Sequence, residues 1–198
     1  MQSKITFGKE DRTLHGTLHD VSDIGVVLCP PHPLMGGSRY DDRLVHLANE
    51  LVKQGISTLC FDYGEYGKGI AEIGDVLSAI SYIKETKKCV GVLGYSFGAV
   101  VSSNAVSQTS EDINGLVTMS ILRKVEKINA DLSSDCKKLM ITGKKDPIVP
   151  YKEFERLYSE AKGKKECLVL DTDHFYSGVM DVVSKKVCEF FNIALKKN

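Results

Sequence analysis

The chain has 198 residues, of which 42% are hydrophobic and 26% are charged, as is ordinary for a folded globular protein. Lys plus Arg and Asp plus Glu number 26 each, so the net charge is zero and nothing electrostatic favours nucleic acid or an anionic membrane as a partner. No apolar stretch is long enough to span a bilayer, and the first residues lack the apolar run of a signal peptide. We therefore expect one cytoplasmic domain over residues 1–198, with no membrane partner.

Patterns in the first third of the chain predict one hairpin, two further strands and one helix. Short alternating runs at residues 5–7 and 14–18 predict an opening hairpin, and Ile24–Cys29 predicts a buried strand. Residues 41–54 place leucines on one helical face and are followed by a glycine, which predicts an amphipathic helix. Residues 56–61 predict the next strand, and a glycine-rich loop follows it.

The middle of the chain continues the alternation of helices and strands. An apolar face at residues 73–83 predicts a helix, residues 89–93 predict a buried strand, and residues 99–106 can start another helix. Ile113–Met119 predicts a further strand. Residues 121–135 suggest a short helix because apolar residues recur there every three or four positions, and they are too few for more than a small flap.

The last third predicts strands at residues 139–142 and 167–170 and helices at residues 151–161 and 179–195. Continuously apolar strands that alternate with helices are typical of an α/β fold, here a three-layer α/β/α sandwich with a mostly parallel central sheet. In such sheets ligands bind beyond the carboxyl ends of the strands, so functional residues are sought in the loops that follow them.

The six cysteines form no C-x-x-C pair and no metal-ligand spacing, so we expect reduced thiols and no metal site. The sequence leaves open whether Cys136 and Cys188 are accessible. Four others fall within apolar, strand-like runs and are expected to be buried: Cys29, Cys60, Cys89 and Cys167.

A G-x-S-x-G motif occupies residues 94–98, between a predicted strand and a predicted helix. A serine on so sharp a turn is held in a strained backbone conformation, and glycines flank it because a Cβ there would collide with the neighbouring element. The serine hydroxyl is presented at a helix N-terminus, whose dipole favours developing negative charge. The motif also occurs in ordinary Gly/Ser loops, but in this context it predicts that Ser96 is a nucleophile.

A serine nucleophile needs a base, and the base needs an acid to orient it. On a parallel sheet of this type the chain order is Ser, acid, His, and His174 is the histidine that follows Ser96. Asp146 lies in a proline-stiffened loop after a strand and is the predicted acid. Asp171 is the alternative, whereas Asp173 adjoins His174 and is expected to point away from the imidazole.

Two backbone N–H groups are expected to stabilise the oxyanion. One belongs to Phe97, directly after the nucleophile. The second should come from the loop after Ile24–Cys29, where the prolines have no N–H; Leu34 is the first choice and Met35 the next. His32 in the same loop is expected to brace it rather than to act in catalysis or bind a metal.

These segments resemble the α/β-hydrolase superfamily over nearly the whole chain. Residues 31–37 (PHPLMGG) are similar to the oxyanion loop of small hydrolases related to dienelactone hydrolase, and residues 146–150 (DPIVP) and 173–176 (DHFY) are similar to the acid and base loops. Residues 61–67 resemble the loop F-D-x-R-G-x-G, with Gly-Glu in place of Arg-Gly. The resemblance implies an α/β-hydrolase fold with little or no cap. Dienelactone hydrolases carry a cysteine nucleophile where this chain has a serine.

Together these residues predict a serine hydrolase, foremost a carboxylesterase that acts on small acyl esters through an acyl-enzyme, without cofactor or metal. Thioester or acyl-peptide cleavage stays open because a triad does not separate these reactions, and so does a non-catalytic binding protein on the same fold. Several side chains near these loops are expected to line an apolar pocket for the small-molecule acyl substrate: Met35, Tyr95, Leu122, Ile148, Phe175 and Tyr176.

Overall fold

The structure is a computed structural model that describes residues 2–196 and contains one large sheet. Its strands are β1 (Gln2–Lys9), β2 (Arg12–His19), β3 (Ile24–Cys29), β4 (Ser57–Asp62), β5 (Cys89–Tyr95), β6 (Ile113–Met119), β9 (Lys137–Gly143) and β10 (Lys165–Leu170). They lie in the order β1-β2-β4-β3-β5-β6-β9-β10. β2 runs antiparallel to both of its neighbours, and the strands from β4 to β10 are parallel. The predicted mostly parallel sheet is confirmed.

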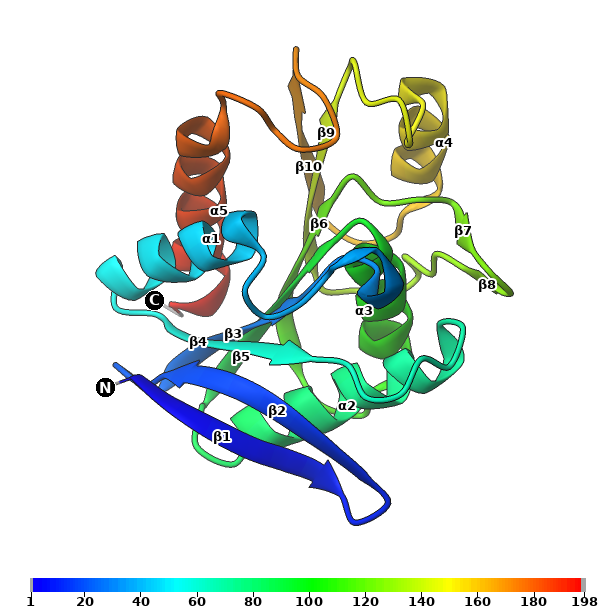
Figure 1. Cartoon of the computed structure of the whole chain (residues 1–198). Helices are drawn as coiled ribbons and strands as arrows, with labels where there is room; N and C mark the ends of the chain where they lie inside the picture. Colours follow the sequence, from blue (N-terminus) through cyan, green and yellow to red (C-terminus); the bar gives the residue numbers. More distant parts are fainter. Residues whose placement is uncertain (1, 197–198) are drawn as a thin grey trace.

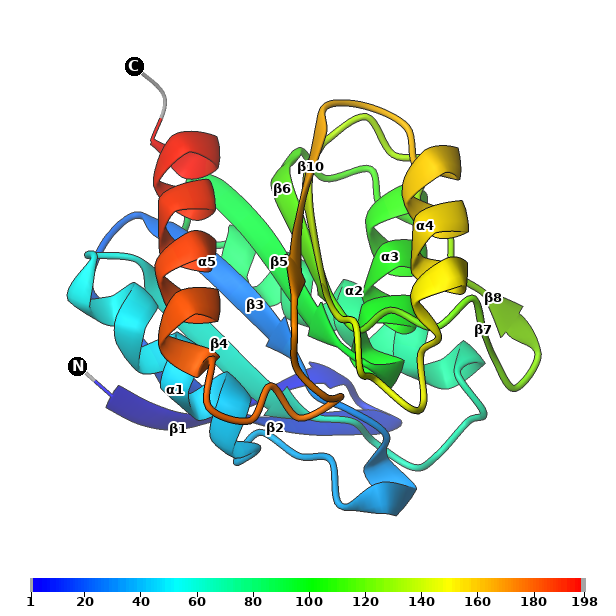
Figure 2. The same cartoon turned by 90° about the horizontal axis from the view of Figure 1, so that it is seen from above.

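Helices cover both faces of this sheet, which confirms the three-layer architecture. The helices are α1 (Asp42–Lys53), α2 (Ile70–Lys84), α3 (Phe97–Gln108), α4 (Tyr151–Glu160) and α5 (Met180–Leu195), and a 3-10 turn, η1 (Pro33–Met35), follows β3. α1 and α5 pack on one face, and α2, α3 and α4 pack on the other (Figures 1 and 2). Within the described residues, none of the helices combines the length and apolarity that crossing a membrane requires.

The first helix shows how local sequence sets an element. Asp41 precedes α1, and its carboxylate accepts hydrogen bonds from the backbone N–H groups of Arg43 and Leu44, which have no partner within the helix. The buried face is formed by leucines and an alanine, and the chain leaves the helix at Gly55, whose φ is +74°. The apolar spacing and the capping residues therefore agree, as the sequence predicted.

The prediction of a short helix at residues 121–135 is wrong. This segment forms a small hairpin of β7 (Lys124–Val125) and β8 (Ile128–Asn129). Val125 and Ile128 face each other across the turn, so their spacing of three positions reflects cross-strand pairing instead of a helical turn. Both side chains pack against the core on the α2 and α3 side of the sheet.

Burial of the cysteines follows the prediction only in part. Cys29 and Cys60 are buried in central strands, whereas Cys89 is half-buried and Cys167 is exposed. Cys167 lies on β10, an edge strand with no fully buried residue, so an apolar run there does not ensure burial. Cys188, which the sequence left open, is buried.

An arginine from β2 braces the glycine-rich loop that follows β4. The Arg12 guanidinium binds both carboxylate oxygens of Asp75 on α2, at 2.5 and 2.8 Å, and donates to the backbone oxygen of Glu65 at 2.8 Å. Gly64 lies against this guanidinium: a Cβ on Gly64 would stand 2.9 Å from Arg12 Cζ. Residues 64 and 65 are Gly-Glu where the similar family loop has Arg-Gly, and the guanidinium of Arg12 from the β1–β2 hairpin contacts the loop at these residues.

Candidate active site

Ser96 lies at the sharp turn between β5 and α3. Its φ of +55° and ψ of −116° are rarely adopted by residues other than glycine, and its N–H donates to the backbone oxygen of Met119 on β6 at 2.8 Å. A Cβ on Gly98 would collide with the carbonyl oxygens of Cys29 and Pro30, so the chain after β3 passes directly over the start of α3. The turn therefore presents the serine hydroxyl at the carboxyl edge of the sheet, beside a helix N-terminus.

His174, in the loop after β10, lies against this serine. Its Nε2 is 3.1 Å from Ser96 Oγ, and its Nδ1 is 2.7 Å from Asp146 Oδ2. Because a carboxylate only accepts hydrogen bonds, Nδ1 carries the proton and Nε2 is free to accept one from the serine. The Tyr95 hydroxyl donates to the His174 backbone oxygen at 3.0 Å and fixes the loop from below.

Asp146 is held on both carboxylate oxygens. Oδ1 accepts the backbone N–H groups of Ile148 and Val149 at 2.8 and 2.9 Å, and Oδ2 accepts His174 Nδ1 and the Ser120 hydroxyl. Burial acts most strongly on the pKa of Asp146 and pushes it up, but the bond from His174 and the two amides outweigh burial and leave that pKa lowered. Asp146 is therefore a carboxylate at neutral pH.

The other candidate acids lie elsewhere. Asp171 pairs with Lys145 at 2.8 Å in an exposed ion pair. The Asp173 carboxylate accepts the N–H groups of Phe175 and Ser177 and so closes its own turn, pointing away from the imidazole as expected. The structure therefore places Asp146, and neither of these two, against the histidine.

Aromatic rings and one charged pair lie around His174: the Tyr95 and Phe175 rings contact it, and Arg43 contacts both rings. Burial raises the pKa of the Tyr95 phenol, and the Arg43 guanidinium acts in the opposite direction. That guanidinium lies 4.9 Å from the Tyr95 ring centre and 5.4 Å from the Phe175 ring centre, and it is paired with Asp41. The Arg43 guanidinium is thus paired with the Asp41 carboxylate, so it adds no unpaired positive charge on this side of His174.

The two N–H groups that the sequence offered from the loop after β3 both make hydrogen bonds within that loop. The Leu34 N–H donates to His32 Nδ1 at 3.2 Å, and the Met35 N–H donates to the His32 backbone oxygen at 3.0 Å. The backbone N–H groups of His32 and Phe97 make no hydrogen bond to any of residues 2–196.

His32 itself braces the loop, as expected. Its ring lies 4.8 Å from the Phe97 ring, and its Nε2 is 3.2 Å from the Tyr66 hydroxyl, which donates to Glu126 on the β7–β8 hairpin. The side chain therefore ties the loop to α3 and to two neighbouring segments. Within the described residues no group of three or more His, Cys, Asp or Glu side chains is arranged to hold a metal ion.

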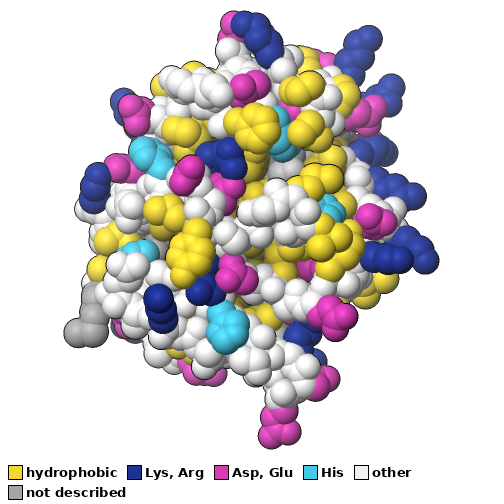
Figure 3. Space-filling view, viewed as in Figure 1, with side chains coloured by type: hydrophobic (Ala, Val, Ile, Leu, Met, Phe, Trp, Pro, Cys, Tyr) yellow, Lys and Arg dark blue, Asp and Glu magenta, His cyan; other side chains and the backbone are white. Residues whose placement is uncertain are grey.

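The side chains expected to line a pocket separate into two groups. Tyr95 and Tyr176 are 1% and 0% exposed and lie beneath His174, so they support the site and cannot line a surface for substrate. Met35, Ile148 and Phe175 are 84%, 51% and 54% exposed. Leu122 is half-buried. Figure 3 shows hydrophobic side chains gathered where η1 and the loop after β10 face the viewer.

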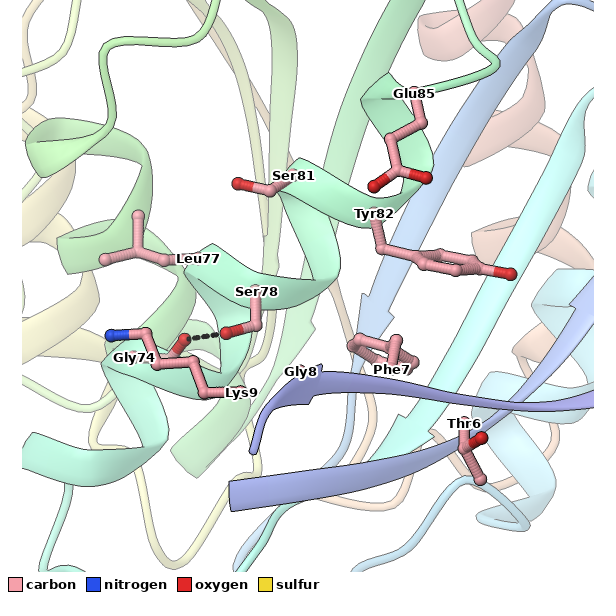
Figure 4. A pocket seen from close by; sticks show the side chains of 10 residues that line it. All are labelled: Thr6, Phe7, Gly8, Lys9, Gly74, Leu77, Ser78, Ser81, Tyr82 and Glu85. Carbon is pink, nitrogen blue, oxygen red and sulfur yellow. Dashed lines mark hydrogen bonds between the residues drawn. The ribbon is translucent and has the colours of Figure 1, made fainter. Parts of the chain in front are cut away.

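A separate groove, with a volume of about 540 Å³, lies between the β1–β2 hairpin and α2 (Figure 4). The Phe7 ring stacks on Tyr82 at 5.1 Å, and the Ser78 hydroxyl donates to the Gly74 backbone oxygen. None of the residues discussed above as candidate site residues lines it. This groove is therefore separate from the cluster of Ser96, His174 and Asp146.

Two elements of the site were missed from the sequence. Ser120 directly follows β6 and could have been found by the rule that led to the loops after β9 and β10, but its role needs the contact with Asp146. The second is the His32 N–H, which lies before Pro33 and makes no hydrogen bond to any of the described residues, whereas the sequence pointed to the residues after Pro33. Its φ of −59° and position beside Phe97 are visible only in three dimensions.

Comparisons with known proteins give the family and the fold. The family described as "Serine hydrolase (FSH1)" matches residues 26–176. No match was found among curated proteins.

Solved structures with the same fold cover nearly the whole chain. An esterase from Pyrococcus furiosus, Pf2001, superposes with a TM-score of 0.87 at 22% identity, over 99% of this chain and 92% of that one. An α/β serine hydrolase without lid from Xanthomonas campestris gives 0.84 at 17% identity, over 100% and 96%. An alpha-beta serine hydrolase homologue from Coxiella burnetii gives 0.82 at 19% identity, over 95% and 96%. The fold is that of the lid-free α/β hydrolases, and the chain belongs to the FSH1 family of serine hydrolases.

Proposed function

We propose that this hydrolase is a carboxylesterase that cleaves small acyl esters through an acyl-enzyme. The observation that carries the proposal is the unbroken hydrogen-bonded path from Ser96 Oγ through His174 to the Asp146 carboxylate. All three side chains come from loops at the carboxyl edge of the sheet, and each is at most 9% exposed. Such a path needs no cofactor or metal to activate the serine.

In the first half of the reaction, Ser96 Oγ attacks the ester carbonyl while His174 Nε2 takes the hydroxyl proton. The Asp146 carboxylate stabilises the imidazolium that forms. The imidazolium then gives the proton to the leaving alcohol, and the acyl group stays on the serine. In the second half, water attacks the acyl-enzyme, His174 takes the water proton and returns it to Ser96, and the carboxylic acid leaves.

The backbone N–H groups of Phe97 and His32 are the proposed oxyanion donors; Phe97 is the donor expected from the sequence, and His32 takes the place of Leu34. Both are without a protein partner, and the two rings lie 4.8 Å apart. His32 has φ −59°, which proline also adopts, so His32→Pro removes the N–H in a compatible backbone. His32→Ala is the matched control that loses the same imidazole and keeps the N–H. We expect His32→Pro to lower kcat about 100-fold or more below His32→Ala; equal rates would exclude this donor.

The acyl side of the site is proposed to be open and apolar. Met35, Ile148 and Phe175 are exposed near the mouth, and Leu122 is half-buried. The hairpin of β7 and β8 is the structure that follows β6, and it is short. An open mouth of this kind favours small acyl groups, because little protein surface is available to bury a long chain.

The test is hydrolysis of p-nitrophenyl acetate, butyrate and octanoate by the wild type, Ser96→Ala and His174→Ala. We expect activity on the short esters and a loss of about 10⁶-fold in kcat in either variant. If the wild type is inactive on all three but a fluorophosphonate labels Ser96, thioesters and acyl peptides become the substrates to test. If no ester is cleaved and no label is incorporated, the proposal fails and a non-catalytic binding role replaces it.

A further inference from the structure

The hydrogen-bonded path does not stop at Asp146. The same oxygen that accepts His174 Nδ1 also accepts the Ser120 hydroxyl at 2.9 Å, and Ser120 Oγ lies 2.9 Å from the Tyr176 hydroxyl. Ser120 and Tyr176 are both 0% exposed, and they come from the loops after β6 and β10. Three loops at one edge of the sheet therefore meet in a single buried chain of hydroxyl and carboxylate groups.

Two hydroxyl protons serve the three close contacts of Ser120 and Tyr176. Asp146 can only accept, so the Ser120 hydroxyl proton points to it. The Tyr176 hydroxyl has one proton and two acceptors in reach, Ser120 Oγ at 2.9 Å and the Ile141 backbone oxygen at 3.1 Å. The Ile141 oxygen already accepts the Ser120 N–H at 2.9 Å. Ser120 therefore donates to Asp146, and the single Tyr176 proton serves either Ser120 Oγ or the Ile141 oxygen; when it is given to Ser120, each bond of the chain polarises the next.

Backbone strain marks the same residues. Ser96, Ser120 and Tyr176 have φ values of +55°, +47° and +58°. Within the described residues, only two other non-glycine residues have a positive φ, Lys68 and Glu126. Such conformations cost about 1–3 kcal/mol each and persist where the surrounding structure over-determines them, often at functional sites. Here three strained residues belong to one hydrogen-bonded network.

The two oxygens of Asp146 are not held alike. Oδ1 is fixed by two backbone amides of its own loop, whereas Oδ2 has the His174 ring on one side and the Ser120 hydroxyl on the other. Ser120 is therefore the group that sets the direction of the oxygen facing the histidine.

We propose that Ser120 and Tyr176 are positioning residues for the hydrolysis, with Tyr176 acting through Ser120 and Ser120 acting through Asp146. The inference rests on the proposed function, because it assigns a task within that reaction. Burial raises the pKa of the Tyr176 phenol, so it stays a neutral donor throughout the working pH range. The Tyr95 ring lies 6.2 Å from the Tyr176 ring, and the charged groups that act on the Tyr95 hydroxyl are Arg43 on α1, Asp41 at the start of α1, Asp146 and Asp173.

The test compares Ser120→Gly, Tyr176→Phe and the double variant, using ester turnover and the rate of fluorophosphonate labelling. Glycine suits a φ of +47°, so Ser120→Gly removes the hydroxyl without new backbone strain, and its thermal unfolding is recorded to show that the variant is folded. We expect kcat to fall about tenfold with KM unchanged. The acid limb of the kcat/KM profile should move up by about 0.5 pH unit, because a carboxylate with one donor fewer holds the imidazolium more strongly.

Tyr176→Phe should lower kcat about threefold in the wild type and have no further effect in Ser120→Gly, since its hydroxyl acts through the serine. Ser102→Ala is the matched control: Ser102 is also 0% exposed, and its hydroxyl donates to a backbone oxygen in α3. That variant should keep the wild-type kcat and pH profile.

An unchanged kcat and acid limb in a folded Ser120→Gly, or additive effects in the double variant, would overturn the positioning role. These outcomes leave the proposed function intact. If the wild type itself neither turns over ester nor takes the label, the proposed function fails and the positioning role falls with it. If the wild type takes the label without turnover, the labelling rate and its pH dependence replace kcat as the measurement.

Discussion

Replacing Arg12 by alanine should destabilise the fold far more than loss of a surface arginine. The Asp75 carboxylate is 1% exposed, and two of its three hydrogen-bond donors belong to Arg12; the third is the Gly64 N–H at 3.0 Å. Removing the guanidinium leaves a buried charge with one donor, which costs about 3–5 kcal/mol of unfolding free energy. With an m-value of about 2–3 kcal/mol/M, the urea midpoint should fall by about 1–2 M.

The assay is urea unfolding of the wild type, Arg12→Ala, Asp75→Ala and the double variant. The two single losses should sum to about 2 kcal/mol more than the loss in the double variant, because the second substitution removes the stranded charge. Arg156→Ala is the control: its ion pair with Glu153 has side chains 66% and 31% exposed, and its loss should cost less than about 0.5 kcal/mol.

The reasoning is refuted if the losses from Arg12→Ala and Asp75→Ala are additive, or if Arg12→Ala costs no more than Arg156→Ala. Either result would mean that the guanidinium is replaced by water, and that the carboxylate is not desolvated as its burial implies.

Three further predictions follow from the packing and titration of single groups. Gly98→Ala should abolish ester hydrolysis and lower the thermal midpoint, because its Cβ collides with two backbone carbonyls, whereas Gly74→Ala in α2 meets nothing within 4 Å and should stabilise by about 1 kcal/mol. At pH 8 a thiol reagent should label exposed Cys167 and leave Cys60 unmodified until urea unfolds the chain, since burial raises the pKa of Cys60 to about 12; early labelling of Cys60 would contradict this. Asp146 has a lowered pKa, so its ionised form stabilises the fold above about pH 4, the usual value in unfolded chains, and that contribution is lost as pH falls through the folded pKa. The difference in unfolding free energy between the wild type and Asp146→Asn should therefore shrink as pH falls from about 5 to about 3; a difference at pH 3 as large as that at pH 5 would refute it.

The sheet and its helices could be predicted because local and global signals agree. β3 and β5 are apolar throughout, and α1 carries both its apolar face and its capping aspartate in the sequence. The hairpin at β7 and β8 could not, since a spacing of three positions fits a helical turn as well as a pair of residues across a tight turn.

The three central site residues could be located because chain order and strand ends restrict the choice strongly. Ser96, Asp146 and His174 lie together as the sequence indicated, although their catalytic role is still a proposal. The sequence could not show which N–H groups of the loop after β3 are free, because this depends on the 3-10 turn of η1 and on the direction of the His32 ring. Tyr95 and Tyr176 were expected in the pocket because they lie next to site residues in the sequence. In the structure both are buried beneath the site, because adjacency in the sequence does not place a side chain on the same surface.

The β7–β8 hairpin also bears on how proteins of this shape could acquire additional domains. Its two strands are paired, so the residues on either side of the turn between Val125 and Ile128 are adjacent in space. A folded segment inserted at that turn would begin and end at nearly the same point and would not reroute the sheet. Because the entropy of closing a loop grows only slowly with its length, such an insertion costs little even when it is long. The turn of this hairpin is thus a position at which a cap domain could be inserted, by evolution or by design.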